Sequence, residues 1–337
     1  MTNSRNSRTT RMPILGLFAL LAILLAACGG ETGSTNGGST NETAASGGTT
    51  QASAQTWAYE LTGDQVYPEG VVYQQSSGDF FVGSTSNGEI FRGSVQEGGG
   101  EAEVFLEGEQ NDRTSAIGLA LDGDGRLFVS GGDTGRMFVY DTESSDLVDS
   151  FQNDRENTFV NDVTVVPSGD AYFTDSFSPV LYKLTATDGG YEFEEWLDLT
   201  NTPIEYSDGF NLNGTVSTDD GRYLIVTHST TGQLFRVDTE SKEVAEIDLG
   251  DGEVAGDGMV LDGQTLYAVT EGEITQVEMS DDYATGTIEN SFSDPSFKSP
   301  TTIAKYDDRL LVINSQFDAR ESGNPELPFT VSDVPIP

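Results

Sequence analysis

The sequence predicts an all-β fold, a six-bladed β-propeller with four-stranded blades, from three observations. Short strands of alternating apolar and polar residues dominate from Trp57 onward, and helical periodicity is almost absent. A unit of three such strands, separated by turns that contain Gly or Asp, recurs six times. Equivalent points of the six units are 48, 44, 52, 44 and 43 residues apart, which is the length of a propeller blade. These points are Gly70, Gly118, Asp162, Gly214, Gly258 and Thr301.

The strands of each unit follow one another in a fixed order. We expect the first strand of each unit to lie innermost and the later strands to lie progressively further from the axis. The expected innermost strands cover residues 69–73, 117–121, 161–165, 213–216, 257–261 and 300–304. The second strands cover 80–83, 126–129, 171–175, 223–227, 265–269 and 310–314, and the third strands 89–92, 136–141, 180–183, 233–238 and 273–277. Outermost strands are expected at 103–106 and 244–247.

The sixth unit has too few strands of its own. Only residues 329–331 follow its second strand, whereas residues 57–61 form a strand with no partner inside the first unit. We therefore expect the N-terminal strand to close the ring by completing the sixth blade, which leaves no long free edge. A β-sandwich would also have short strands and frequent turns, but it gives no reason for six equal units.

The chain is expected to begin with a signal peptide, residues 1–27. Three Arg and no acidic residue precede an apolar run from 12 to 27 that is short for a membrane span. Leu25-Ala26-Ala27-Cys28-Gly29 resembles the bacterial lipobox, which implies lipidation of Cys28 and an anchor in the cell membrane, with the protein facing the extracellular side. The alternative is ordinary secretory cleavage after Ala27.

Residues 28–55 are predicted to be the lipidated Cys and a flexible linker, because Gly, Ser, Thr, Asn and Ala cannot bury enough apolar surface to fold. The propeller then covers 56–337. With 16 Lys and Arg against 56 Asp and Glu, the chain has a net charge of −40. This charge opposes binding to nucleic acid, so no nucleic-acid partner is expected. Halophilic adaptation is the preferred interpretation of the charge, and an acidic, cation-attracting surface is the alternative. We expect a monomer.

The starts of the innermost strands converge on one end of the axis, so they are the expected functional site. They are Glu69, Ile117, Asn161, Asn213, Asp257 and Pro300. Four of them carry oxygen donors, which suits a hard divalent cation, with Ca²⁺ ahead of Mg²⁺. The alternative is that Glu-Gly, Asn-Gly and Asp-Gly pairs only mark turns.

The strand starts resemble those of the gluconolactonase/regucalcin (senescence marker protein) family of six-bladed propellers. The similarity lies in Glu69-Gly70, Asn161-Asp162, Asn213-Gly214 with the later Asp220-Gly221-Arg222, and Asp257-Gly258. It implies a divalent metal bound by Glu69, Asn161, Asn213 and Asp257, with Asp257 as the proton-transfer residue. The implied activity is metal-dependent hydrolysis of lactones or related esters.

Two departures from that pattern argue against a sugar lactone and indicate a less polar substrate, or no substrate at all. Phe159 stands where sugar-lactone members often have Arg, and Val71 and Val72 stand where Pro and an aromatic residue are usual. The alternative function is a non-catalytic surface propeller that binds a protein, a glycan or a small ligand and holds a structural metal. Further pocket candidates are Ile117, Phe159, Asn211, His228 and Thr301, although a structural histidine is the preferred interpretation of the lone His228.

Overall fold

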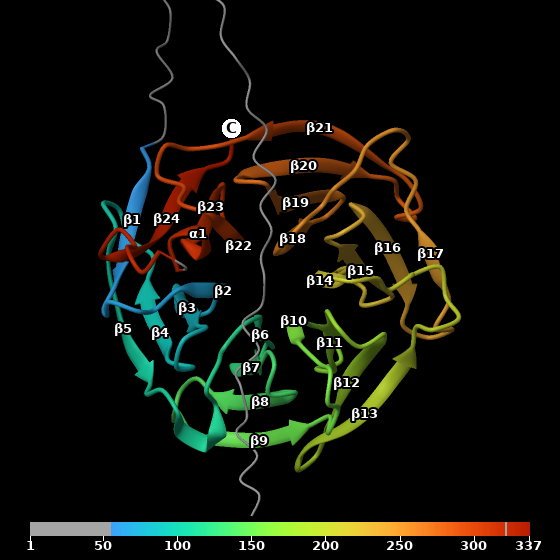
Figure 1. The fold of residues 1–337 in the computed structure, drawn as a ribbon, viewed down its shortest axis with the longest axis horizontal. Helices are drawn as coiled ribbons and strands as arrows, with labels where there is room; N and C mark the ends of the chain where they lie inside the picture. The colour runs from blue at the N-terminus through green and yellow to red at the C-terminus, as the bar shows by residue number, and fades with distance from the viewer. Residues whose placement is uncertain (1–54, 321) are drawn as a thin grey trace, which may run out of the picture. The chain divides into compact units, whose positions relative to one another are not determined.

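The computed structural model describes residues 55–320 and 322–337, which form antiparallel sheets arranged radially around a central axis (Figure 1). The all-β prediction is confirmed, and the architecture is that of a β-propeller. The predicted signal peptide, Cys28 and nearly all of the predicted linker lie outside the described residues. Within the described part, no helix is long and apolar enough to cross a membrane.

Four of the sheets are four-stranded meanders in which each strand pairs antiparallel with the next. Their second strands carry apolar residues at consecutive positions, as in Leu127-Phe128-Val129, because a sheet packed between two neighbouring sheets buries both of its faces. The first sheet has β6 (Leu119–Leu121), β7 (Arg126–Ser130), β8 (Arg136–Asp141) and β9 (Leu147–Gln152), and the second has β10 (Val160–Val165), β11 (Ala171–Asp175), β12 (Val180–Thr187) and β13 (Gly190–Asp198). The third has β14 (Leu212–Ser217), β15 (Tyr223–His228), β16 (Gln233–Asp238) and β17 (Val244–Glu246), and the fourth has β18 (Met259–Asp262), β19 (Thr265–Thr270), β20 (Glu273–Met279) and β21 (Gly286–Phe292).

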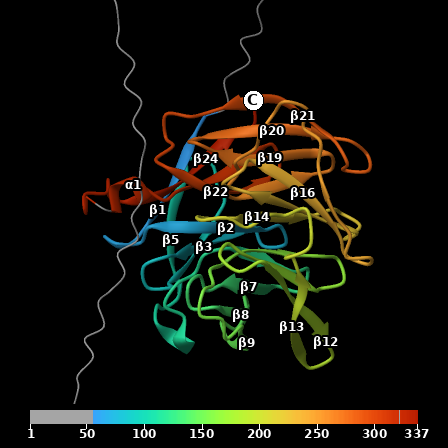
Figure 2. The ribbon, with the colours of Figure 1, turned by 45° about the vertical axis from the view of Figure 1, so that its right-hand side comes forward.

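The fifth sheet has eight strands and contains both ends of the described chain. Its order is β2-β3-β4-β5-β1-β24-β23-β22, and its centre is the pairing of β1 with β5 on one side and β24 on the other. Figure 2 shows β1 and β24 side by side. The prediction that the N-terminal strand closes the ring is confirmed. The strands are β1 (Trp57–Leu61), β2 (Pro68–Gln74), β3 (Asp79–Ser84), β4 (Ile90–Ser94), β5 (Gly100–Leu106), β22 (Pro300–Tyr306), β23 (Arg309–Asn314) and β24 (Phe329–Pro335), and two single turns of helix are η1 (Gln110–Asp112) and α1 (Phe317–Arg320).

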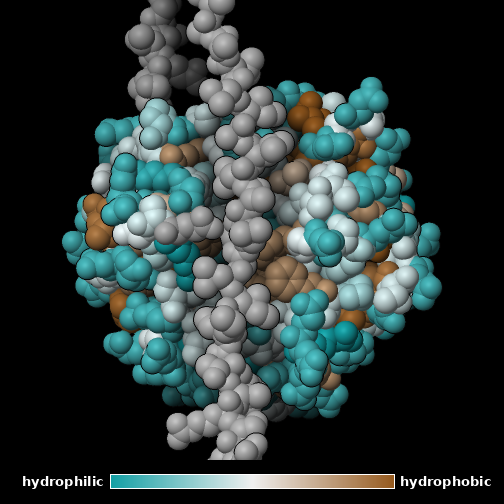
Figure 3. Space-filling view, viewed as in Figure 1, coloured by the Kyte–Doolittle hydropathy of each residue, from teal (hydrophilic) through white to brown (hydrophobic). Residues whose placement is uncertain are grey.

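Apolar side chains fill the space between neighbouring sheets. Phe128 and Met137 of one sheet pack with Phe173 and Tyr182 of the next, and each of the four is fully buried. Burial of such large side chains is the main favourable term for each contact between sheets. The outer rim is mostly hydrophilic (Figure 3).

The innermost strands β2, β6, β10, β14, β18 and β22 contact one another in order, and β22 returns to β2. Glycine allows this close approach. A Cβ added to Gly70 would lie 2.1 Å from the carbonyl oxygen of Ile117, and one added to Gly214 would lie 2.2 Å from that of Asp257. The recurring glycines of the repeat therefore set how closely the backbones meet around the axis.

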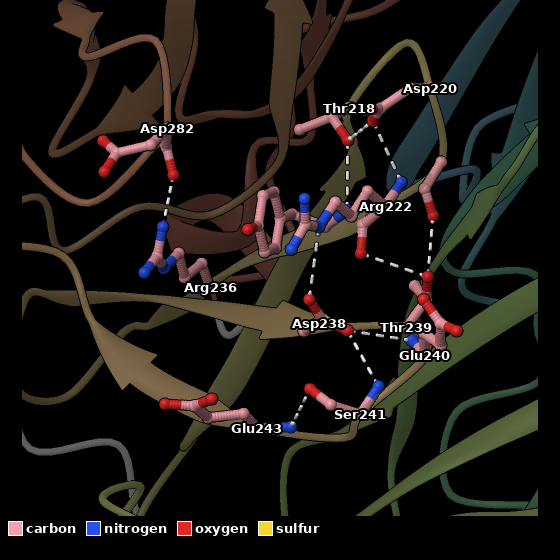
Figure 4. Close-up of polar contacts among 12 residues, drawn as sticks. Thr218, Asp220, Arg222, Arg236, Asp238, Thr239, Glu240, Ser241, Glu243 and Asp282 are labelled. Carbon is pink, nitrogen blue, oxygen red and sulfur yellow. Dashed lines mark hydrogen bonds and ion pairs between the residues drawn. The ribbon is translucent and has the colours of Figure 1, made fainter.

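The Asp220-Gly221-Arg222 segment is a structural turn (Figure 4). The Asp220 carboxylate accepts hydrogen bonds from the Thr218 hydroxyl at 2.7 Å and from the Arg222 backbone N–H at 3.0 Å. This turn follows the end of β14, whereas Asn213 lies at the beginning of that strand. The segment therefore belongs to the scaffold and not to the candidate site.

A buried polar cluster fastens the strands that close the ring. The Asp333 carboxylate of β24 accepts hydrogen bonds from Arg309 Nε of β23 at 2.6 Å, from the Tyr306 hydroxyl of β22 at 2.6 Å and from the Tyr59 hydroxyl of β1 at 3.3 Å. The Arg309 guanidinium also lies 4.1 Å from the ring centre of Trp57 in β1. Both charged groups are thus satisfied inside the protein, and the cluster spans four strands of the closing sheet.

We predict that Asp333→Asn lowers the free energy of unfolding by about 3–5 kcal/mol, because it leaves the buried Arg309 charge unpaired. Chemical denaturation measures this change. Glu195→Gln is the matched control, since it breaks the half-exposed ion pair with Arg155 and should cost about 1 kcal/mol or less. Equal losses for the two variants would contradict the role given to the Asp333 cluster.

Candidate functional site at the axis

The starts of the innermost strands meet around one end of the axis, as predicted. The Gly118 N–H donates to the Asn161 carbonyl at 2.9 Å, and the Gly258 N–H donates to the Thr301 carbonyl at 2.8 Å. The Thr301 hydroxyl donates to the Glu69 carbonyl at 3.2 Å. Backbone contacts thus fix the positions of these residues with respect to one another.

A β-bulge interrupts four of these strands at the same place. The pairing register shifts between Pro68 and Val71, between Val160 and Val163, between Leu212 and Thr215, and between Pro300 and Ile303. The bulged pairs are Glu69-Gly70, Asn161-Asp162, Asn213-Gly214 and Thr301-Thr302. A bulge changes the direction in which its side chains point. Each of these bulges can therefore direct a polar side chain toward the axis, while the other residues of the same strand pack into the core.

Three carboxylates form the centre of the site: Glu69, Asp162 and Asp257. Burial raises the pKa of both Asp162 and Asp257 to about 7, and the Asp162 charge adds to the effect on Asp257. Burial raises the pKa of Glu69 well above its usual range, and the charges of Asp257 and Asp162 raise it further. We call Glu69, Asp162, Asn213 and Asp257 the axial site.

Among the residues described, the carboxylates of the axial site accept hydrogen bonds only from neutral groups, so no positive charge balances them. Asn213 Nδ2 donates to Asp257 Oδ1 at 2.9 Å, the Thr215 N–H donates to Asp162 Oδ2 at 2.8 Å, and the Thr302 hydroxyl donates to Glu69 Oε1 at 3.3 Å. Glu69 Oε2 is buried and has no hydrogen-bond partner within the described residues. None of the ion pairs found between residues 55 and 337, residue 321 aside, includes a carboxylate of this site.

These donors fit a divalent cation in their chemistry. Two carboxylates and an amide of the predicted set, Glu69, Asp257 and Asn213, lie in the axial site, and such oxygen donors suit a hard cation. The buried and unpartnered Glu69 Oε2 is the atom that most needs a positive partner. In the part of the chain that the structure describes, no three His, Cys, Asp or Glu side chains are already gathered closely enough to hold a metal ion.

The side-chain hydrogen bond of Asn161 uses only its Nδ2 donor, so its Oδ1 stays available as the predicted metal ligand. Asp162 is an additional acidic residue that sequence reasoning did not select. Asn161 Nδ2 donates to the Ser176 hydroxyl at 2.9 Å, and its side chain is buried. Asp162 acts electrostatically on both Glu69 and Asp257. The sequence did contain a feature that sets Asp162 apart, because this residue occupies the position that holds Gly in four of the other units.

The remaining pocket candidates fall into two groups. Asn211 and His228 are buried supports: His228 Nε2 lies 3.1 Å from the Glu205 carbonyl, and its Nδ1 accepts from the Thr231 N–H at 3.3 Å. Ile117 and Thr301 line the ring of strand starts, where they contact the Glu69-Gly70 backbone. Phe159 is half-buried and packs against two other phenylalanine rings.

A depression on the described surface lies away from the axis. It has a volume of about 570 Å³ and is formed by β16, β17 and the loop that follows, with Glu246, Asp248 and Asp251 in its wall. Its residues do not include any residue of the axial site, so it is a feature of the outer rim.

Fold and site together define a β-propeller with an acidic axial site. Its fold is similar to that of the calcium-binding protein regucalcin from Agrobacterium tumefaciens, with a TM-score of 0.56, 17% identity and coverage of 80% of this chain and 90% of that one. It is also similar to a gluconolactonase from Xanthomonas campestris, with a TM-score of 0.57, 14% identity and coverage of 83% and 88%. The predicted resemblance is thus confirmed at the level of the fold.

A third similar structure is a catalytically inactive virginiamycin B lyase from Staphylococcus aureus, with a His-to-Ala substitution and bound quinupristin, at a TM-score of 0.56, 15% identity and coverage of 84% and 88%. The single His of the present chain is buried among backbone partners. No protein-family model matches the chain, and no curated protein matches its sequence.

We predict that the metal-free protein loses stability as the pH rises from about 5 to about 8. The folded chain keeps protons on Glu69, Asp162 and Asp257, whose pKa values are raised, whereas the unfolded chain releases them near pH 4. The folded state therefore binds more protons, and its advantage disappears as the pH rises through about 7. Denaturation midpoints in chelator and high salt measure the change.

The control for this pH dependence is Glu69→Gln combined with Asp162→Asn. High salt screens the repulsion between surface charges, so the remaining slope should come mainly from the axial site. The double variant should have a clearly flatter profile than the wild type. A slope that the two substitutions leave undiminished would assign the effect to the surface charge instead.

Proposed function

We propose that the protein is a metal-dependent hydrolase of lactones or related esters, similar in activity to a gluconolactonase. The observation that supports this most directly is the axial site, where Glu69 Oε2 is buried without a hydrogen-bond partner among the described residues and the charges of Asp162 and Asp257 act on the same carboxylate. A hard divalent cation, most readily Ca²⁺, would balance these charges. The similarity in fold to a gluconolactonase and to calcium-binding regucalcin agrees with this proposal.

Each residue of the axial site has a definite role in the proposal. The predicted set Glu69, Asn161, Asn213 and Asp257 would hold the metal, Asn161 through its Oδ1. A divalent cation bound there supplies a Lewis acid for an ester carbonyl and for the charge that develops on its oxygen. Asp257 accepts the proton of the attacking water, and the Asn213 amide orients this carboxylate through the hydrogen bond to Oδ1. Asp162 adds negative charge close to both Glu69 and Asp257, which strengthens attraction of the cation.

We also propose that the ring consists of six blades. The eight-stranded sheet then counts as two blades, β2 to β5 and β22 to β24 with β1, joined by the parallel pairing of β1 with β5. Cell-surface display through a lipid on Cys28 and a monomeric state complete the proposal. Small-molecule substrates would reach the site from the extracellular side.

The competing proposal is a non-catalytic surface propeller with a structural metal. A cation at the axial site would join residues of β2 and β14 with Asp257, which lies two residues before β18, and could stabilise the ring without catalysis. A propeller fold is compatible with either role. Metal binding and turnover must therefore be tested separately.

We predict that Ca²⁺ raises the thermal midpoint of the full-length chain in high salt and that Glu69→Gln with Asp257→Asn abolishes this rise. A ligand that binds the folded state alone stabilises it in proportion to the logarithm of its concentration. The matched control is Asp251→Asn with Glu253→Gln, which removes the same charge from exposed positions. If both double variants respond like the wild type, Ca²⁺ is only screening the surface and the axial metal site is wrong.

We predict that the metal-loaded chain hydrolyses lactones or esters and that Asp257→Asn lowers kcat/KM by at least about a hundredfold, through loss of the proton acceptor. Product release in a pH-stat measures the rate, and chelation should stop it. Calcium binding with no turnover on a broad lactone and ester panel would favour the non-catalytic propeller. Turnover that Asp257→Asn leaves unchanged would remove Asp257 from the mechanism.

A further inference from the structure

Three phenylalanines from separate segments form an aromatic cluster beside the axial site. Phe159 precedes β10, Phe177 lies between β11 and β12, and Phe210 precedes β14. Their ring centroids are 5.7 Å apart for Phe159 and Phe177, 5.3 Å for Phe159 and Phe210, and 5.1 Å for Phe177 and Phe210. Each ring is only half-buried, so the cluster offers apolar surface to solvent. We call these three residues the aromatic wall.

The aromatic wall is held in place by buried polar groups. The Asp175 carboxylate is fully buried, and its Oδ1 accepts the backbone N–H groups of Phe159 and Phe177, each at 2.9 Å. Asn211 Nδ2 donates to the Ser176 carbonyl at 2.9 Å, which ties the segment after Phe210 to the segment before Phe177. Preorganisation of this kind is typical of binding surfaces, because it removes the ordering cost from the binding step.

The aromatic wall is continuous with the axial site. A Cβ placed on Gly132 would lie 3.2 Å from Ile117 and 3.4 Å from the ring of Phe159, so these two side chains flank one glycine. The Ile117 carbonyl in turn abuts Gly70, the neighbour of Glu69. On the other side, Ser176 binds the Asn161 side chain and directly precedes Phe177. Figure 3 shows brown, apolar surface close to the middle of the ring.

The chemistry of this surface selects among substrates. Phe159, Phe177, Phe210 and Ile117 have no side-chain group that donates or accepts a hydrogen bond, so they cannot replace the water that binds the hydroxyl groups of a polyol. They can bury an alkyl chain or an aryl ring, which gains free energy in proportion to the apolar area removed from water. We infer that the aromatic wall binds the apolar substituent of an alkyl- or aryl-substituted lactone or ester. This inference rests on the proposed function and names its substrate class.

The test compares lactones that differ only in their apolar substituent. The full-length, Ca²⁺-loaded chain is assayed with γ-butyrolactone, with γ-alkyl-butyrolactones of increasing chain length and with glucono-lactone. The wild type should prefer the longer alkyl chains. Phe177→Ala and Phe210→Ala should each reduce the ratio of kcat/KM for the alkylated to the unsubstituted lactone about tenfold. The ratio is independent of the fraction of folded enzyme, so a folding defect cannot imitate this result.

Phe151→Ala is the matched control. Phe151 is also a half-buried phenylalanine in an aromatic pair, stacked on Phe193 with centroids 6.1 Å apart, but it lies in β9. It should leave the selectivity ratio unchanged. Preference for glucono-lactone, or a ratio that the two wall substitutions do not alter, would overturn the inference while leaving the hydrolase proposal intact.

A second measurement separates failure of the inference from failure of the proposed function. Alkyl lactams have the shape of the lactones but resist hydrolysis, so their binding to the metal-loaded chain is followed by calorimetry whether or not any lactone is turned over. Affinity that increases with chain length and falls about tenfold in Phe177→Ala supports the aromatic wall even in a protein without activity. Affinity that is independent of chain length overturns it.

Discussion

The pairing of β1 with β24 is the constraint on which the rest of this structure depends. Radially arranged sheets are stable only as a closed ring, because an open ring would expose the flank of a sheet and the apolar side chains that pack against its neighbour. Closure is achieved by hydrogen bonds along Trp57–Leu61 and by the buried cluster around Asp333, which joins β1, β22, β23 and β24. The same closure brings β2 beside β22, and so brings Glu69 to within reach of Thr302.

The axial site is a product of two local devices in the repeat. Glycines such as Gly70 and Gly214 allow neighbouring backbones to approach closely, and the bulges at the beginning of four inner strands release one side chain from the alternation of the strand. The outcome is a set of carboxylates that the protein itself does not neutralise. Carboxylates without a cationic partner lower the stability of the fold. Destabilising arrangements of this kind are typical of functional sites.

The sequence was sufficient for the propeller architecture, but it did not indicate that Asp162, next to the predicted ligand Asn161, would act on Glu69 and Asp257. Strand positions and ring closure follow from alternating residues and from the lack of a partner for residues 57–61, both of which are local features. The orientation of Asn161 and Asp162 depends on a register shift between Val160 and Val163, and this shift is decided by pairing with β11. The aromatic wall was missed as a unit for a related reason, since its three residues lie in loops whose meeting is fixed by buried Asp175 and Asn211.

The position of β1 has a consequence for how the protein is made. Tyr59 and Asp333 are 274 residues apart in the chain, yet they bond to each other across the seam of the ring. During synthesis from the N-terminus, β1 must remain without its β24 partner until Phe329–Pro335 has emerged. The ring therefore cannot close before β24 has been synthesised, and contacts of such long range are slow to form. A chain that lost its last strand would leave β1 with a free edge, ready to pair with another molecule.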